Sequence, residues 1–145
     1  MSKFDYVIVG AGSSGSALAG RLATNKHTKI LLLEAGPEDL NPYIKIPIGY
    51  GKLFYDQSVN WKFYTEPEEN LHGKKMYWPR GKVLGGSSSI NAMVFARGSR
   101  NDFDEWGAHA SGWSWQDIEP FFRKMETWKG KSDQSRGQSG PVKVT

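Results

Sequence analysis

Two short apolar runs near the start of the chain enclose a segment with a different periodicity. The runs from Phe4 to Val9 and from Lys29 to Leu33 are rich in aliphatic and aromatic residues, a composition that predicts strands. Between them, residues 16–25 place two leucines four positions apart among alanines, which predicts a helix that packs one face on a sheet. A strand, a helix and a second strand within about 30 residues are typical of a parallel α/β unit.

The turn between the first strand and the helix is rich in glycine. Gly10, Gly12 and Gly15 have the spacing of a dinucleotide-binding fingerprint. In that fingerprint the first glycine permits a tight turn, the second lets the backbone approach a pyrophosphate, and the third lets the helix pack closely on the sheet. Glu34 ends the second strand, where its carboxylate can accept hydrogen bonds from an adenosine ribose and would repel a 2′-phosphate. The pattern therefore predicts a dinucleotide site other than one for NADP.

The turn allows two other interpretations. The first is a glycine-rich turn in an ordinary parallel α/β unit, with Glu34 as a solvated strand end. The second is a P-loop, because Gly10 and Gly15 have its glycine spacing. A P-loop needs lysine at the next position to reach the phosphates, and Ser16 stands there instead.

The long segment from Asn41 to Trp78 shows no clean period. It is punctuated by proline and dense in aromatic residues. A loop of this length in a compact domain is usually functional or hides short elements. Its aromatic residues either fill a core or cover a cofactor, and both roles can hold together.

Further elements are predicted in the second half of the chain. A serine cluster between Gly85 and Ala96 is well placed to start a helix. The segment from Ser99 to Asp102 has the pattern of a capping box, and Ser114 to Asp117 repeats it before a helical stretch. Pro120 either kinks that helix or sits in its first turn. Residues 141–145 alternate like a strand, and since the chain stops there we expect it to be truncated.

Composition narrows the functional classes. The chain has 145 residues, 38% of them hydrophobic, enough for one domain, and its net charge of +4 includes no long basic run of the kind that binds nucleic acid. No cysteine is present, which excludes disulfides, thiolate metal sites and cysteinyl-flavin links within the chain, and no metal site is indicated. The longest apolar stretch, residues 30–33, is too short to span a membrane. A strand that begins at Phe4 argues against a signal peptide, so we expect a cytoplasmic protein, with peripheral membrane association left open.

A second dense motif runs from Trp78 to Gly98. Gly85 and Gly86 allow the backbone to approach something flat or charged, and the serines that follow supply hydroxyls and helix caps. Asn91 offers a donor and an acceptor to the edge of a heteroaromatic ring. Taken alone, this motif is more typical of a glycine–serine turn before a helix.

Together the two motifs resemble the glucose–methanol–choline (GMC) oxidoreductase family. The resemblance covers the whole chain, including residues 60–67 and the family signature from Gly81 to Asp104, and is strongest to the choline dehydrogenase-like and alcohol dehydrogenase branch. It implies an α/β fold in which residues 1–145 form the N-terminal part of a Rossmann-like FAD-binding domain. It also implies FAD rather than NAD. Because Ile90 stands where some members carry a histidine linked to the flavin, we expect non-covalent FAD.

The resemblance also implies which residues hold the cofactor. The glycine turn would bind the pyrophosphate and Glu34 the ribose. Val83 and the segment from Gly85 to Val94 would line the flavin, with Asn91 and the backbone of residues 92–94 near the ring. The expected cofactor-binding residues are Gly10, Gly12, Ser13, Ser14, Gly15, Glu34, Ala35, Trp61, Arg80, Val83, Gly85, Gly86, Ser87, Asn91, Ala92, Met93 and Val94.

No catalytic residue is assigned within the chain. Enzymes of the family take the hydroxyl proton of an alcohol with a histidine while hydride passes to flavin N5, and that histidine lies in a C-terminal part that is absent here. His27, His72 and His109 match no family motif, so we expect them at the surface. The chain alone is therefore expected not to oxidise its small-molecule alcohol substrate.

Three functional interpretations remain. The chain is the FAD-binding part of an alcohol dehydrogenase completed by a C-terminal polypeptide, an NAD-binding module, or a non-catalytic remnant that keeps a nucleotide half-site. Glu34 permits the NAD-binding module, but the motif from Gly81 to Gly98 does not predict it. In each case an incomplete sheet is expected to expose an unpaired edge and an apolar face.

Overall fold

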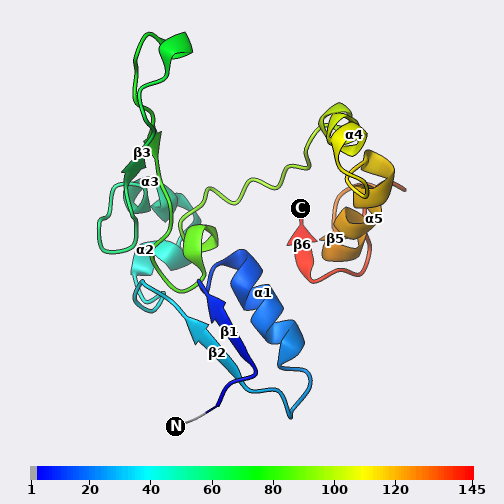
Figure 1. Ribbon diagram of the computed structural model, residues 1–145, viewed down its shortest axis with the longest axis horizontal. Coiled ribbons are helices and arrows are strands. Elements are labelled where there is room, and N and C mark those ends of the chain that lie inside the picture. The colour runs from blue at the N-terminus through cyan, green and yellow to red at the C-terminus, as the bar shows by residue number, and fades with distance from the viewer. Residues whose placement is uncertain (1–2) are drawn as a thin grey trace. The chain divides into compact units, whose positions relative to one another are not determined.

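A computed structural model describes residues 3–145 and shows two compact units (Figure 1). The first unit extends to Val94 and the second runs from Phe95 to Thr145. Each unit has its own helices, strands and buried residues. The residues that the structure describes thus form two compact units, and their assignment to the N-terminal part of one FAD-binding domain stays a prediction.

The first unit begins with the predicted strand, helix and strand. Strand β1 (Tyr6–Val9) pairs in parallel with β2 (Ile30–Leu33), so that Val9 lies opposite Leu33. Helix α1 (Ser13–Leu22) connects them and starts three positions earlier than the periodicity predicted. Gly12 is the N-cap, which places the serines of the turn in the first helical turn.

The segment from Asn41 to Trp78 hides short elements, one of the two alternatives left open by the sequence. Prolines begin two of them, and the Asn41 side chain caps the first by accepting the Tyr43 N–H at 3.0 Å. The antiparallel β3–β4 pair forms a hairpin in which Phe63 lies opposite Trp78. The elements are α2 (Pro42–Lys45), η1 (Pro47–Gly49), α3 (Tyr50–Leu53), β3 (Phe63–Tyr64), η2 (Glu69–Leu71) and β4 (Tyr77–Trp78).

A small buried cluster joins these short elements to the second motif. Leu53 and Val59 come from the irregular segment, and Val83 and Ile90 flank the glycine–serine turn. All four are almost completely shielded from solvent, with Ile44 packed against them. Their burial ties the second motif to the first unit.

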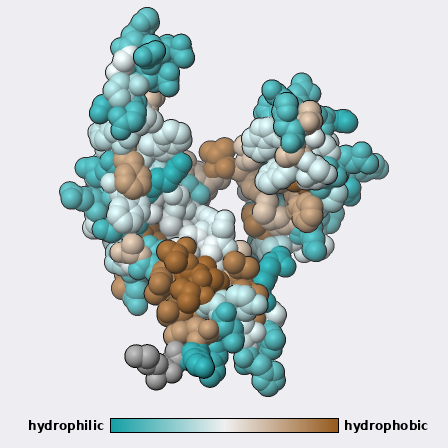
Figure 2. Space-filling model, in the orientation of Figure 1, coloured by the Kyte–Doolittle hydropathy of each residue, from teal (hydrophilic) through white to brown (hydrophobic). Residues whose placement is uncertain are grey.

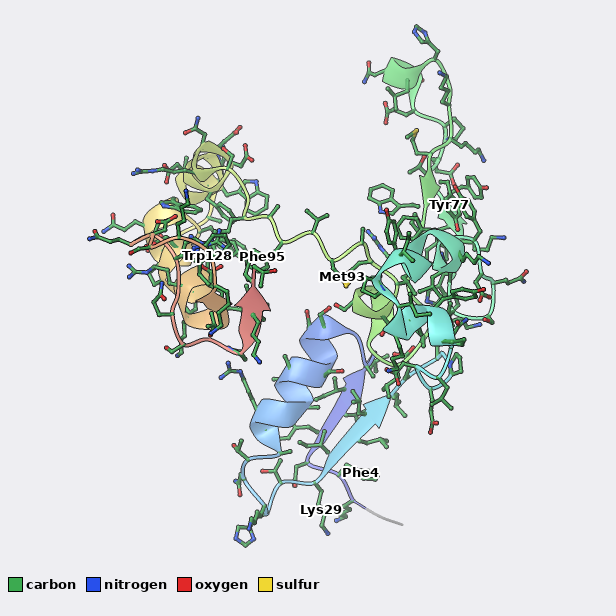
Figure 3. The ribbon with its side chains drawn as sticks, turned by 180° about the vertical axis from the view of Figure 1, so that it is seen from behind. Phe4, Lys29, Tyr77, Met93, Phe95 and Trp128 are labelled. Atoms are coloured by element: carbon green, nitrogen blue, oxygen red, sulfur yellow. The ribbon has the colours of Figure 1, made fainter. Side chains whose placement is uncertain are left out.

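The helix predicted at the serine cluster is wrong beyond a single 3₁₀ turn, η3 (Gly86–Ser89). Gly85 and Gly86 both have left-handed backbones, with φ of +93° and +60°, so no α-helix runs through them. After η3 the buried side chain of Ile90 anchors the chain in the core. Residues 90–99 then continue without helix or strand, and Figure 3 labels Met93 on this segment.

The second unit packs two helices beside a small sheet. Helix α4 (Arg100–His109) is capped by Ser99 Oγ, which accepts the Asn101 N–H at 3.2 Å. The N-terminus of helix α5 (Trp115–Met125) carries the predicted capping box, since the Ser114 N–H donates to Asp117 Oδ2 at 3.2 Å. Pro120 lies inside α5 beyond its first turn.

Strand β5 follows α5 directly. It runs from Glu126 to Trp128 and pairs in parallel with β6 (Val142–Val144), the strand predicted at the end of the chain. No periodic pattern predicted β5, because it follows the last residue of α5 without a break in the sequence. The long connection between the two strands carries the polar and glycine-rich sequence expected of a loop.

Part of the β1–β2 sheet leaves apolar side chains open to solvent. Val7 is 58% exposed and Val9 is 83% exposed, and Figure 2 shows hydrophobic side chains gathered over these strands. Within residues 3–145 this sheet has two strands. The expectation of an exposed apolar face is therefore confirmed, and such a face is typical of a surface that packs against another element.

Candidate functional site

The glycine turn has the geometry that its spacing predicted. Gly10 has a φ of +93°, and its N–H donates to Leu33 O at 2.8 Å, which fixes the turn at the end of β2. A Cβ on Gly15 would overlap the carbonyl oxygen of Gly10 and lie 3.3 Å from Ile8 Cγ2. The predicted role of Gly15 in close packing of helix on strand is therefore confirmed.

The carboxylate of Glu34 is held by the backbone on both sides. Its Oε2 accepts the Ala11 N–H at 2.8 Å, and its Oε1 accepts the Gly36 N–H at 2.9 Å. A carboxylate oxygen can accept a second hydrogen bond, so Oε1 and Oε2 can each still accept one from a ligand hydroxyl. The half-buried acid is thus fixed at the end of β2, beside the glycine turn.

The second motif meets the first at the start of α1. The Gly85 N–H donates to Ala11 O at 2.8 Å, and the hydroxyls of Ser13 and Ser88 hydrogen-bond to each other. A Cβ on Gly86 would lie 2.8 Å from the Cα of Gly12, closer than real Cβ contacts come. The two glycine motifs, far apart in sequence, therefore form one backbone surface.

A third backbone segment, after β2, joins this surface at Gly36, and the second motif adds Gly81 to it. The Gly81 N–H donates to Ser87 Oγ at 3.1 Å, and a Cβ on Gly81 would overlap the backbone of Gly86. A Cβ on Gly36 would likewise overlap the backbone of Lys82. Side chains are thus excluded from the contacts among the three segments.

These segments enclose a cleft of about 580 Å³ in the first unit. Most of the residues around it belong to the predicted cofactor set, and the others directly precede a predicted residue or begin the family signature. The lining residues are Val9, Gly10, Gly12, Leu33, Glu34, Ala35, Trp61, Gly81, Gly86 and Ser87. Sequence reasoning missed Val9, Leu33 and Gly81, although strand ends before a glycine turn are an available signal for the first two.

The other predicted cofactor residues have different surroundings. Ser13 and Ser14 occupy the first turn of α1 with exposed side chains, at the end of the helix whose free N–H groups favour an anion. Val83 is completely buried in the core and does not line the cleft. The guanidinium of Arg80 lies 5.3 Å from the centroid of the Trp78 ring.

The segment from Asn91 to Val94 is exposed and carries a local backbone constraint. Asn91 Oδ1 accepts the Met93 N–H at 2.8 Å, and Met93 has a left-handed φ of +59°. The side-chain oxygen of Asn91 is therefore engaged within its own loop, while its amide nitrogen retains its donors.

The three histidines are exposed, as the sequence predicted. His27 lies before β2, His72 has a left-handed φ of +56° after η2, and His109 ends α4. None of them lines the cleft of the first unit.

The second unit contains a buried ion cluster that sequence reasoning missed. Glu126 Oε1 lies 2.6 Å from Arg97 Nη2 and 2.8 Å from Arg136 Nε, and it accepts the Gly137 N–H at 2.8 Å. Burial raises the pKa of Glu126, but the Gly137 N–H and the two guanidinium charges outweigh it, so the pKa is lowered overall. No motif marks these residues as neighbours in the sequence.

The cleft beside the glycine turn, with a fixed acid after β2, defines a dinucleotide-binding protein.

The comparisons with known proteins identify one family. The family described as GMC oxidoreductase matches residues 4–145. A GMC-type oxidoreductase of Mycobacterium bovis is 45% identical over 97% of the chain and 28% of its own length. The oxygen-dependent choline dehydrogenase of Vibrio vulnificus is 46% identical over 96% of the chain and 25% of its own length.

Solved structures give the same result. Pyridoxine 4-oxidase from Mesorbium loti superposes with a TM-score of 0.85 at 36% identity, over 97% of the chain and 28% of that protein. A formate oxidase from Aspergillus oryzae RIB40 superposes with a TM-score of 0.81 at 31% identity, over 97% and 26%. The chain thus spans about a quarter of the length of these relatives.

The chain belongs to the GMC oxidoreductase family, and its cofactor is FAD. The residues present fit this group, because the close approach of Gly12 and Gly86 brings bare backbone to the wall of the cleft and Glu34 keeps acceptor capacity beside it. Among the helices of the described residues, none has the length and apolar character needed to cross a bilayer.

Proposed function

We propose that the chain forms the FAD-binding part of an enzyme that oxidises the CH–OH group of a small alcohol. Bound FAD would accept the hydride of the alcohol carbon at N5. The chain's own task is to bind and orient the cofactor. The observation that carries this proposal is the cleft in which Glu34 and three glycine-bearing backbone segments converge.

Each part of the cleft suits one part of the cofactor. The N-terminus of α1, with Gly12 and Ser13, would hold the pyrophosphate, since free N–H groups and the helix dipole favour negative charge there. The carboxylate of Glu34 would accept hydrogen bonds from the hydroxyls of the adenosine ribose through its remaining lone pairs. The Gly85–Gly86 turn would let the cofactor lie against bare backbone, and the exposed residues 91–94 would line the flavin.

We further propose that FAD is bound non-covalently. Ile90 stands where some family members have a flavin-linked histidine, and its side chain is 3% exposed and packed in the core. An apolar side chain that points into the core offers no nucleophile to the flavin.

The alcohol is of the choline dehydrogenase-like class in this proposal. It rests on 46% identity to the oxygen-dependent choline dehydrogenase of Vibrio vulnificus. The catalytic histidine would come from a polypeptide segment that the relatives contain beyond the quarter that this chain matches. Without that segment the chain would bind FAD but would not oxidise alcohol. A cytoplasmic location stays a prediction.

The test is an absorbance spectrum of the purified chain after incubation with FAD and removal of free ligand. Retained flavin bands that acid precipitation releases would support non-covalent binding, whereas bands that remain with the precipitate would contradict it. A folded chain that retains no FAD would overturn the proposed cofactor-binding role. Retention of NAD instead of FAD would favour the NAD-binding module.

A further inference from the structure

A buried amide directly precedes Trp61, a residue of the cleft wall, in the sequence. Asn60 is 2% exposed, and its Nδ2 donates to Phe54 O at 2.8 Å. Its Oδ1 accepts two backbone N–H groups, that of Lys62 at 2.9 Å and that of Arg80 at 3.0 Å. One side chain thus ties together the end of α3, the entry to β3 and the chain that leaves β4.

The bond to Lys62 holds an uncommon backbone conformation. Lys62 has a φ of +55°, in the left-handed region that a residue with a Cβ seldom adopts. An asparagine side chain that accepts the N–H two residues ahead is a known way to stabilise such a turn. Trp61 is the central residue of this turn, between Asn60 and Lys62.

Trp61 belongs to the wall of the cleft. It lines the same cavity as Glu34, and its N–H donates to Arg80 O at 2.9 Å. Its ring stacks on Phe63, with centroids 5.8 Å apart, and lies 4.7 Å from Lys82 Nζ. The orientation of the indole therefore depends on the turn that Asn60 holds.

We infer that Asn60 is a positioning residue of the cofactor site, which sets Trp61 against the cleft without itself touching the cofactor. This inference rests on the proposed function, because it requires that FAD occupies the cleft. Asn60 acts through the two hydrogen bonds that its Oδ1 accepts, from the N–H groups of Lys62 and Arg80. Loss of these bonds frees the Lys62 turn to relax to negative φ and releases Trp61 from the wall.

The test is a cycle of FAD titrations on the chain with N60A, W61A and the double variant. N60A and W61A are each expected to weaken FAD binding about tenfold, the effect of one well-formed hydrogen bond or contact. The double variant should bind FAD no more weakly than W61A, because Asn60 acts through Trp61. A merely structural role for Asn60 would instead make the two losses multiply.

A rescue variant and a matched control sharpen the test. K62G should restore most of the affinity lost in N60A, because glycine adopts positive φ without the aid of a side chain. N41A removes a half-buried amide of the first unit, which caps α2 and donates to Asp56 Oδ2 but does not line the cleft, and should leave FAD affinity within about twofold of wild type. If N60A does not fold, N60L, which fills a similar volume but offers no acceptor to the Lys62 N–H, replaces it in the same cycle.

The outcomes separate this inference from the proposed function. A folded wild-type chain that binds no FAD overturns both. A wild-type chain that binds FAD, with N60A unchanged or with losses that multiply, overturns only the role of Asn60. The role of Asn60 is supported if the double variant binds FAD no more weakly than W61A and if K62G restores the affinity that N60A loses.

Discussion

The backbone N–H of Ala11 donates to Oε2 of Glu34 at 2.8 Å and so ties the glycine turn to the end of β2. Ala11 is completely buried, and its carbonyl accepts the Gly85 N–H at 2.8 Å. One residue between two glycines therefore connects the first motif, the acid and the second motif. The acid has a structural task in addition to any contact with a ribose.

This double role makes Glu34→Gln informative. A glutamine has one acceptor oxygen, so either the Ala11 or the Gly36 N–H would face an amide nitrogen. We expect FAD affinity to fall at least about tenfold, because charged hydrogen bonds in the cleft are lost. Isothermal titration with FAD measures this. Glu38→Gln, which changes a nearby exposed acid, should bind like wild type, and equal losses in both variants would contradict the assignment of Glu34.

Two glycines of α1 should respond oppositely to alanine. A Cβ on Gly15 would overlap the carbonyl oxygen of Gly10, whereas one on Gly20 would meet open space. Gly15→Ala should therefore lower the free energy of unfolding by about 2 kcal/mol or more, as overpacking does. Gly20→Ala should raise it by about 0.5–1 kcal/mol through helix propensity. Urea unfolding of both variants checks the pair, and a tolerated Gly15→Ala would refute the close helix–strand packing.

The first unit shows which parts of the fold local sequence can predict. The turn from Gly10 to Gly15 and the strands around it were predictable because each glycine answers a nearby backbone requirement. Seven residues of the predicted cofactor set line the cleft, including Glu34, Trp61 and Gly86. For Trp61 and Gly86 the family resemblance supplied the prediction, since no local pattern relates them to Gly12.

Other features depend on contacts between distant residues. The serine cluster predicts a helix locally, but positive φ at Gly85 and burial of Ile90 override it. Strand β5 exists because it pairs with β6, a contact between Glu126 and Val142 that no local pattern around Glu126 predicts. No local sequence pattern predicts that Glu126 forms ion pairs with Arg97 and Arg136.

A substitution at Gly86 directly tests the close approach of the Gly12 and Gly86 backbones. Gly86→Ala places a Cβ 2.8 Å from Gly12 Cα and imposes a side chain on a φ of +60°, so FAD affinity should fall more than about tenfold. Gly73→Ala is its control, because Gly73 has a φ of +73° but open space around its Cβ position. Both variants carry similar backbone strain, so a difference in FAD affinity isolates the close contact. Equal affinities would argue that the Gly12–Gly86 approach does not form the site.

The ion cluster around Glu126 predicts that the second unit loses stability in acid. The folded-state pKa of Glu126 lies below its ordinary value of 4.5, so the stability that its ionised form contributes is present above about pH 4.5 and is lost as pH falls through the folded-state pKa.

Glu126→Gln should remove much of this acid dependence. It should also lower the free energy of unfolding at pH 7 by about 3 kcal/mol, because two buried guanidinium groups lose their counter-charge. Glu105→Gln, at an exposed acid of α4, should stay within about 0.5 kcal/mol of wild type. Urea unfolding from pH 7 to pH 3, followed by tryptophan fluorescence, provides the measurement. If Glu126→Gln kept the wild-type dependence on pH, the acid response would arise from other carboxylates, and the cluster would serve packing rather than charge balance.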